Sequence, residues 1–341
     1  MDINTFLEDK LKHSAISNIN AFERDKLKKL GLADYIKMTL TSKKFRKWPV
    51  DEDVKITIDR IVNENIKADK PIPFVFPFGG YKHWSLENFP YADWAEFFFL
   101  SYYIEYLSRV AVVYKPGVIL YLLSDDAAIE LMNNVSNENQ DLYIKSIQEV
   151  INEFAKYLPE NIKLKLVRTV PDLYKTREEY YQVLTKNRKV GEEMVAKLDE
   201  AKYKAKYVMS EFNLLLNGKE NLTNLNDEEK KKKIINGMIL HDCVVFNEKR
   251  GAFVRGGDKI LLFTTKIPNG LALGMTKTSI AKFWTGMGIL EDRGADLQER
   301  VLSPEQIKAL KPKMLKNKVN VIPIKGFDEI YVYNGQLNYK K

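Results

Sequence analysis

The segment 76–84, FPFGGYKHW, combines residue types that can bind an anion and move a proton. Gly79 and Gly80 follow an apolar run and would let backbone N–H groups approach an oxyanion. Lys82 adds a compact positive charge suited to phosphate or carboxylate, and His83 can act as an acid or a base near neutral pH. The alternative is a tight turn in which Lys82 is solvated and the aromatic residues only pack. Because these residues coincide at the end of a predicted strand, we favour a binding site.

A second apolar run, 118–123, ends in the polar triplet Ser124-Asp125-Asp126. If this run is a strand beside the one that precedes Gly79, Asp125 would face the space above Lys82. Its carboxylate would there hold an amine or a sugar hydroxyl, or act as a base, and Ser124 would contribute to substrate binding. The alternative is that Ser124 or Asp125 only caps a helix that begins at Ala127.

Three further cations are candidate substrate or phosphate ligands. Arg168 follows the apolar run 162–167, and its guanidinium suits a bidentate contact with an anion, although a surface ion pair is as good an interpretation. Arg255 opens the glycine turn RGGDK, which also fits an ordinary hairpin. Lys277 lies in GMTKTS, a pattern typical of a phosphate-binding turn, but the full Walker motif is missing and a plain helix N-cap fits it too.

Alternating apolar and helix-like segments predict the elements that position these residues. Strands are predicted at 71–78, 118–123 and 162–167, with helices at 93–113, 127–132 and 141–157. This alternation is typical of a parallel sheet built by right-handed crossovers, and ligands bind beyond the carboxyl ends of such strands. The sequence therefore predicts an α/β fold with a Rossmann-like parallel sheet.

Four parts are expected along the chain. They are a helical N-terminal region at 1–53, a Rossmann-like α/β core at 54–175, a helical segment at 176–240 and an α+β, strand-rich C-terminal part at 241–341. In the last part we predict strands at 243–246, 259–264, 270–275, 319–324 and 330–333, and one helix at 279–290.

Composition excludes several classes of protein. The 341 residues are 45% apolar and 29% charged, as in ordinary folded proteins. A single cysteine, Cys243, cannot form an intramolecular disulfide, and three scattered histidines lack metal-ligand spacing, so we expect neither a metal nor a cofactor. No run approaches the ~18 apolar residues of a membrane span, and the first residues lack the apolar core of a secretory signal. We expect a cytoplasmic protein with no membrane partner.

The net charge of +8 comes from 54 basic and 46 acidic residues, and 43 of the bases are lysines. Basic clusters lie at 43–47 and 230–233, but no helix-turn-helix, zinc-finger or RNA-binding signature accompanies them. Arginine is the better fork for phosphates and base edges, so we expect at most weak polyanion contact. A non-catalytic nucleic-acid-binding or interaction protein is the alternative from a different class.

The order of motifs within residues 60–170 resembles the isonitrile (isocyanide) synthase family of the pyoverdine and dityrosine biosynthesis type. The matching pieces are Phe76-Pro77 with Lys82, Pro90 to Asp93 with Glu96, Tyr114 to Gly117, Ser124-Asp125-Asp126, and Tyr143 in a later helix. Two departures stand out. The family's lysine lies closer to its proline and precedes Ser-Pro-Asn, whereas Gly79-Gly80-Tyr81 is inserted here, and Asp126 replaces a glycine.

The resemblance implies a Rossmann-like biosynthetic enzyme without a metal, which condenses the amine of an amino acid with the carbonyl of a pentulose phosphate to form an isonitrile. We therefore predict an isonitrile-synthase-like transferase or lyase that acts on a sugar phosphate and an amine-bearing partner. His83 and Asp125 would be catalytic, while Lys82 and an arginine would hold the anion. The alternative enzyme is a nucleotide- or nucleoside-modifying transferase on the same scaffold.

Overall fold

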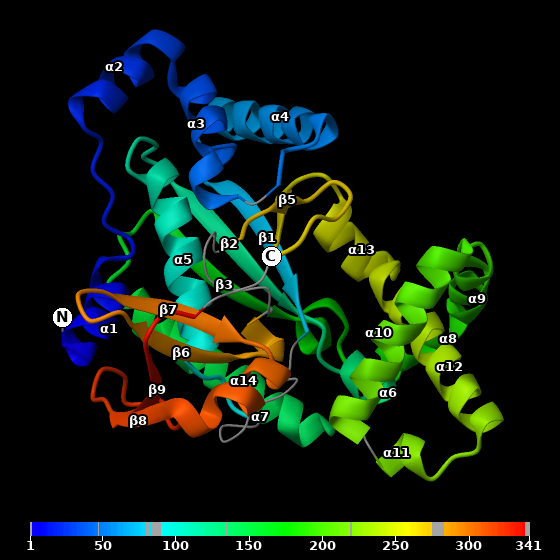
Figure 1. Cartoon of the computed structure of the whole chain (residues 1–341). Helices are drawn as coiled ribbons and strands as arrows, with labels where there is room; N and C mark the ends of the chain where they lie inside the picture. The colour runs from blue at the N-terminus through cyan, green and yellow to red at the C-terminus, as the bar shows by residue number, and fades with distance from the viewer. Residues whose placement is uncertain are drawn as a thin grey trace.

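The computed structural model describes residues 2–46, 48–79, 82, 90–133, 135–218, 220–274 and 283–337, except for the side chains of 212, 213, 215–218, 220 and 221. Its centre is a five-stranded parallel sheet in the order β3-β2-β1-β4-β5 (Figure 1). The strands are β1 (Ile72–Phe78), β2 (Val118–Ser124), β3 (Ile162–Arg168), β4 (Ile260–Phe263) and β5 (Leu271–Ala272). The α/β fold with a parallel sheet core is thus confirmed.

Crossover helices cover both faces of this sheet. Alternate residues of β1, such as Phe74 and Phe76, pack with α5 (Trp94–Ala111) and α7 (Asn137–Ala155) in one large core. The residues between them, such as Val75, pack with Leu123 and Val254 on the side of α13 (Glu248–Arg255). Because side chains alternate between the faces of a strand, α5 and α13 lie on opposite sides of the sheet.

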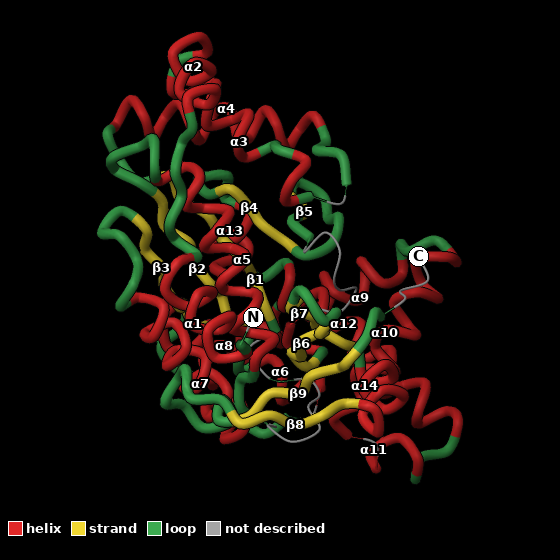
Figure 2. Tube along the Cα trace, turned by 60° about the vertical axis from the view of Figure 1, so that its left-hand side comes forward, coloured by secondary structure: helices red, strands yellow, loops and turns green. Residues whose placement is uncertain are grey.

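A second, mixed sheet has the order β7-β6-β9-β8 and lies beside the first turn of α5. Figure 2 shows β8 and β9 running side by side at one end of the molecule. A Cβ atom added to Gly288 would lie 2.3 Å from the backbone of Trp94 and Ala95, so only glycine lets this sheet approach the helix so closely. The strands are β6 (Met287–Asp292), β7 (Leu297–Leu302), β8 (Met314–Lys318) and β9 (Glu329–Asn334).

The remaining helices form two groups (Figure 1). The N-terminal group comprises α1 (Ile3–His13), α2 (Ala21–Leu30), α3 (Leu32–Leu40) and α4 (Glu52–Ala68). Helices α2 to α4 lie near the amino ends of the strands, whereas α1 contacts α5 and α7 beside the second sheet. In the second group α6 (Ala128–Asn133) follows β2, and the other helices follow β3; they are α8 (Arg177–Lys186), α9 (Arg188–Ala196), α10 (Glu200–Gly218), α11 (Glu220–Thr223) and α12 (Asp227–Val245). The short α14 (Pro304–Leu310) stands apart and follows β7 of the second sheet. No helix of the described residues is long and apolar enough to cross a membrane.

Several predictions for the C-terminal part are wrong. The strand predicted at 243–246 is instead the end of α12 and its cap, and the hairpin at 255–259 is a connection from α13 into the parallel strand β4. The described part of the helix predicted at 279–290 is a short 3-10 helix, η3 (Phe283–Thr285), followed by β6. Residues 319–324 form no strand, and β5 keeps only two residues of the strand predicted at 270–275.

Candidate functional site

Lys82 is completely buried beyond the carboxyl end of β1, where its ammonium group contacts two carboxylates. Its Nζ lies 3.0 Å from Asp93 Oδ1 and 2.9 Å from each carboxylate oxygen of Glu96. It also donates to the backbone oxygen of Phe283, at 3.0 Å. These acceptors use all three protons of the ammonium group. Lys82 therefore joins the segment after β1 to the start of α5 and to η3.

The sequence places both carboxylates at the N-terminus of α5. Asp93 is the N-cap residue, whose Oδ1 accepts a hydrogen bond from the backbone of Ala95 at 2.7 Å. Glu96 returns a contact, because its Oε2 accepts from the backbone N–H of Asp93 at 2.8 Å. This capping box aligns two acids on one helix turn. Since residues 94–101 of α5 are all buried, Glu96 has no route to solvent along its own helix.

Tyr143 of α7 completes the buried cluster. Its hydroxyl donates to Glu96 Oε1 at 3.0 Å. Ser146, one turn later, donates to the backbone oxygen of Tyr143 and accepts from the backbone N–H of Ala92, both at 2.8 Å. These bonds fix α7 against the start of α5. We call Lys82, Asp93, Glu96 and Tyr143 the Lys82 cluster.

Charge is unbalanced within the Lys82 cluster, because one ammonium group faces two carboxylates. Burial raises the pKa of Glu96 to about 8, and the charge of Asp93 raises it too, against the opposing effect of Lys82. Burial lowers the pKa of Lys82, but the two carboxylates outweigh it, so that the net shift is upward. A proton on Glu96 near neutral pH would leave one carboxylate for one ammonium group. The cluster thus contains a buried carboxyl group whose pKa is raised to about 8.

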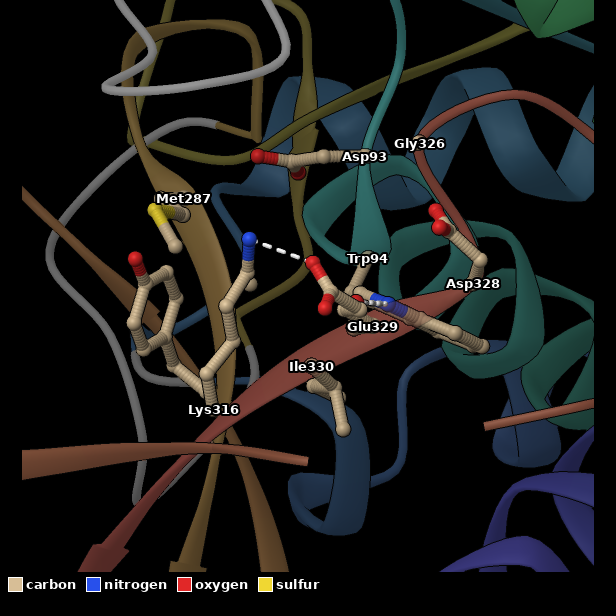
Figure 3. A pocket seen from close by; sticks show the side chains of 10 residues that line it. Asp93, Trp94, Met287, Lys316, Gly326, Asp328, Glu329 and Ile330 are labelled. Carbon is tan, nitrogen blue, oxygen red and sulfur yellow. Dashed lines mark hydrogen bonds and ion pairs between the residues drawn. The ribbon is translucent and has the colours of Figure 1, made fainter. Parts of the chain in front are cut away.

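One carboxylate oxygen in this cluster has no partner. Asp93 Oδ2 is buried, and no hydrogen bond to it is found among the described residues. Asp93 borders a cavity of about 30 Å³ between α5 and the second sheet, where Met287, Lys316 and Tyr331 also lie. Figure 3 shows Asp93 with its carboxylate turned toward this hollow, and Lys316 bound to Glu329 across it. The unpartnered oxygen is a ready acceptor for a ligand N–H or O–H group.

Asp125 does not face Lys82, contrary to the sequence-based prediction. It follows β2 next to Phe78, whose backbone oxygen accepts from its N–H at 3.1 Å. Its carboxylate is held by the buried Arg250 of α13 in a two-point contact of 2.5 and 2.9 Å. Because α13 and α5 cover opposite faces, the two groups flank the sheet end rather than share one hollow.

Ser124 and Arg168 are also engaged within the protein. The buried hydroxyl of Ser124 donates to Asp126 Oδ1 at 3.1 Å. Arg168 donates to Asp126 at 2.7 Å and to Asp141 at 2.6 Å, so the ion-pair interpretation fits this arginine. Burial raises the pKa of Asp126, while Arg168 opposes that shift. The structure therefore brings these residues together as a folding contact between β2, β3 and α7.

Arg255 differs from Lys82 and Arg168, because no carboxylate contacts it among the described residues. It is exposed at the end of α13, and its guanidinium lies 4.8 Å from the ring centroid of Phe246. Partial desolvation of its guanidinium and repulsion from Arg250 lower its pKa. Gly79 directly follows β1. Gly80, His83 and Lys277 lie outside the described residues.

Asp93, Glu96, Tyr143 and Arg250 carry no predicted role from the sequence. The first three were visible only as pieces of the family resemblance, although the spacing Asp-x-x-Glu before an apolar helix is itself a capping-box signature. Nothing in the sequence near Arg250 marks it as a partner of a residue 125 positions away. Among the described residues, no group of three or more His, Cys, Asp or Glu side chains is arranged to hold a metal.

Comparisons with known proteins identify the fold. No protein-family model matches the sequence, and no curated protein gives a significant match. Among solved structures, the PvcA protein from Pseudomonas aeruginosa matches with a TM-score of 0.67 at 15% sequence identity. The match covers 89% of this chain and 99% of the PvcA chain. At such low identity the two proteins are shown to share a fold, and an activity must be argued from the site.

Proposed function

We propose that this chain is a biosynthetic enzyme of the isonitrile-synthase kind, which condenses the amine of an amino acid with the carbonyl of a pentulose phosphate. Two independent lines support the proposal. The motifs of residues 60–170 resemble that family, and the fold that the chain shares with PvcA is an α/β scaffold of the kind that the resemblance implies.

The observation that carries the proposal is the convergence of the resembling motifs. Lys82, Asp93, Glu96 and Tyr143 come from three separate segments, yet their polar groups meet within hydrogen-bond distance. The meeting point lies beyond the carboxyl end of β1, where open α/β sheets bind ligands. A cluster that combines a raised carboxyl pKa with an unpartnered acceptor is typical of a site that handles protons.

The proposed roles follow from these contacts. Glu96 takes or gives the proton of the reacting amine, because its pKa of about 8 is close to neutral pH. Asp93 Oδ2 accepts a hydrogen bond from the amine. Lys82 is a positioning residue that fixes both carboxylates, and this role replaces the anion-binding role expected from the sequence.

The phosphate is assigned to the remaining predicted cation, Lys277. Arg255 is left out of the phosphate site, because it ends α13 on the face of the sheet opposite the Lys82 cluster and precedes β4 at the amino end of the parallel strands. Lys277, with the backbone of Gly79 and Gly80, stays in the proposal on the sequence pattern alone. His83 stays as a proposed acid or base on the same ground, and Asp125, Ser124 and Arg168 are proposed to shape the sheet end beside the substrate.

The test is product formation from defined substrates. The protein is incubated with ribulose 5-phosphate and each amino acid in turn, and isonitriles are trapped with a tetrazine and identified by mass spectrometry. We expect one amino acid to give a product and Glu96→Gln to abolish it while the variant stays folded. Lys277→Gln should raise KM for the sugar phosphate more than it lowers kcat. Folded protein that yields no isonitrile with any amino acid would overturn the proposal.

A further inference from the structure

A large hollow lies at the far end of α5 from the Lys82 cluster. It has a volume of about 550 Å³ and is bordered by residues of α2, α3, the segment after α3 and the C-terminal end of α5. Since α5 has 18 residues, it separates this hollow from Glu96 by roughly 20 to 27 Å. We call it the α2–α3 groove and define it by Phe22, Lys26, Met38, Lys43, Arg109 and Val112.

Apolar side chains gather on the walls of the α2–α3 groove. Phe22 is 67% exposed, Met38 37% and Val112 38%. Phe22 belongs to α2, which buries none of its residues, whereas α3 and α5 bury their other faces. Phe45 and Tyr35 also line the groove and are almost completely buried. Single exposed apolar residues are common on proteins, but three around one hollow indicate a surface that an apolar ligand would cover.

Positive charge dominates the same groove. Five lysines and arginines border it against one carboxylate, Glu23; they are Lys26, Lys43, Lys44, Arg46 and Arg109. Two of them are engaged, because Lys44 pairs with Glu105 at 2.8 Å and Arg46 donates to backbone oxygens, including that of Thr41 at 2.9 Å.

The other three cations keep donors available. Lys26 lies 4.6 Å above the ring of Phe22, and neither it nor Lys43 meets a carboxylate among the described residues. Arg109 is 3.7 Å from Glu23, and its Nε is buried without a hydrogen-bond partner in the part of the chain that the structure describes. A buried guanidinium N–H without an acceptor is costly, so an anionic acceptor supplied by a ligand would be favoured here.

We propose that the α2–α3 groove is a binding site for a small amphipathic anion, with an apolar chain or ring against Phe22, Met38 and Val112 and a carboxylate or phosphate group against Lys26, Lys43 and Arg109. The volume falls within the range of small-molecule pockets. Apolar side chains line the same hollow as the cations, which distinguishes this site from the basic stripe of a nucleic-acid surface. The proposal is independent of the chemistry assigned to the Lys82 cluster.

The experiment uses the full chain labelled with carbon-13 at the methionine methyl groups. Octanoate and octyl phosphate are titrated while the methyl signals are followed by NMR, and octyltrimethylammonium serves as the probe of opposite charge. We expect a saturable shift of the Met38 signal, no shift of Met287 beside the Lys82 cluster, and binding of the cationic probe at least about tenfold weaker. The tighter of the two anions identifies the head group that the site prefers.

Paired variants test the charge contribution. Lys26→Gln with Lys43→Gln should weaken binding about five- to tenfold, since each exposed ionic contact contributes modestly. The control pair, Lys163→Gln with Lys313→Gln, removes the same charge from exposed positions outside the groove and should leave affinity unchanged. A Met38 signal that does not move, equal affinity for the cationic probe, or equal weakening in the control pair would each overturn the proposal.

Discussion

Two sets of buried charges lie at the carboxyl end of the parallel sheet, one on each face. They differ in the number of carboxylates that contact each cation. In the Lys82 cluster one ammonium group contacts two carboxylates, all at most 1% exposed. On the face of α13, Arg250 and Asp125 form a one-to-one fork, and Asp125 retains 16% of its side-chain exposure.

The difference in matching decides what each set can do. A surplus carboxylate in a dry environment holds a proton more strongly, which is why the pKa of Glu96 rises to about 8. A matched guanidinium and carboxylate satisfy each other and act as a rigid connection between β2 and α13. An excess of buried carboxylates over cations thus gives a carboxyl group that retains its proton, whereas equal numbers of the two give a structural contact.

The largest effect is expected for Lys82→Met, which leaves two buried carboxylates without a cation. We expect the free energy of unfolding at pH 8 to fall by about 3 to 5 kcal/mol, and by less at pH 5, where the carboxyl groups can bind protons. Urea denaturation measures both values. The control is Lys37→Met, because Lys37 also contacts two carboxylates, Asp34 and Asp59, but at the surface. It should cost under about 1 kcal/mol, and an equal cost for both variants would contradict the role of burial.

The next largest effect is expected on the pH dependence of stability. Each unit of pKa shift corresponds to about 1.4 kcal/mol, so Glu96→Gln should change the pH-dependent part of the free energy of unfolding by a few kcal/mol. The pKa of Glu96 is higher in the folded protein than in the unfolded chain, so its contribution is complete below about 4.5 and is lost as pH rises through about 8. The free energy of unfolding of the wild type relative to Glu96→Gln should therefore fall from pH 5 to pH 8.

Glu291 provides the matched control for this measurement. Its side chain is also inaccessible to solvent, but it lies nearer the surface, because the partly exposed Arg293 contacts it together with Arg300. These two arginines lower its pKa against the opposing effect of burial. Between pH 5 and pH 8 the wild type relative to Glu291→Gln should thus show a flat difference. A flat profile for Glu96→Gln as well would show that the charge imbalance of the Lys82 cluster does not move its proton.

The matched pair is tested by Arg250→Met, expected to lower the free energy of unfolding by about 2 kcal/mol, because water can still reach the partly exposed Asp125. The double variant Asp125→Asn with Arg250→Met should recover part of this loss, since it removes the unpaired charge. Both values come from denaturation at pH 7. A loss from Arg250→Met larger than that from Lys82→Met would reverse the ranking of the two sets.

The sequence was sufficient to predict the strands β1 to β3 and the helices between them, because each apolar run has strand length and ends at a glycine, a proline or a polar residue. The prediction from the sequence failed where both faces of a strand are buried, because apolar and polar residues then do not alternate. All but the last residue of β6 are buried, so the segment has no alternation and its apolar spacing also fits a helix. The run Cys243–Phe246 has β-branched residues typical of a strand, but it ends α12, where Cys243 packs against Gly191.

At the candidate site, the sequence predicts which residues lie at the strand ends, but it does not predict which groups those side chains contact. Lys82 does lie beyond the end of β1, as its position after Phe78 indicates. Its acceptors depend on how α5 and η3 pack, and the backbone oxygen of Phe283 comes from 201 residues away. The same holds for Arg250 and Asp125. A lysine after a glycine turn suggests an anion ligand, and only tertiary packing shows that carboxylates of the protein already occupy it.

The smallest effect is expected for Tyr143→Phe, which removes one hydroxyl from the Lys82 cluster. Its hydrogen bond to Glu96 Oε1, 3.0 Å long, favours the ionised carboxylate. Losing it should cost about 1 kcal/mol of unfolding free energy and raise the pKa of Glu96 further, so that the stability loss between pH 5 and pH 8 shifts to higher pH. Tyr180→Phe is the matched control, because the Tyr180 hydroxyl is buried without a partner among the described residues. Removing an unsatisfied hydroxyl should leave stability unchanged or raise it, and a loss equal to that of Tyr143→Phe would mean that the bond to Glu96 contributes nothing specific.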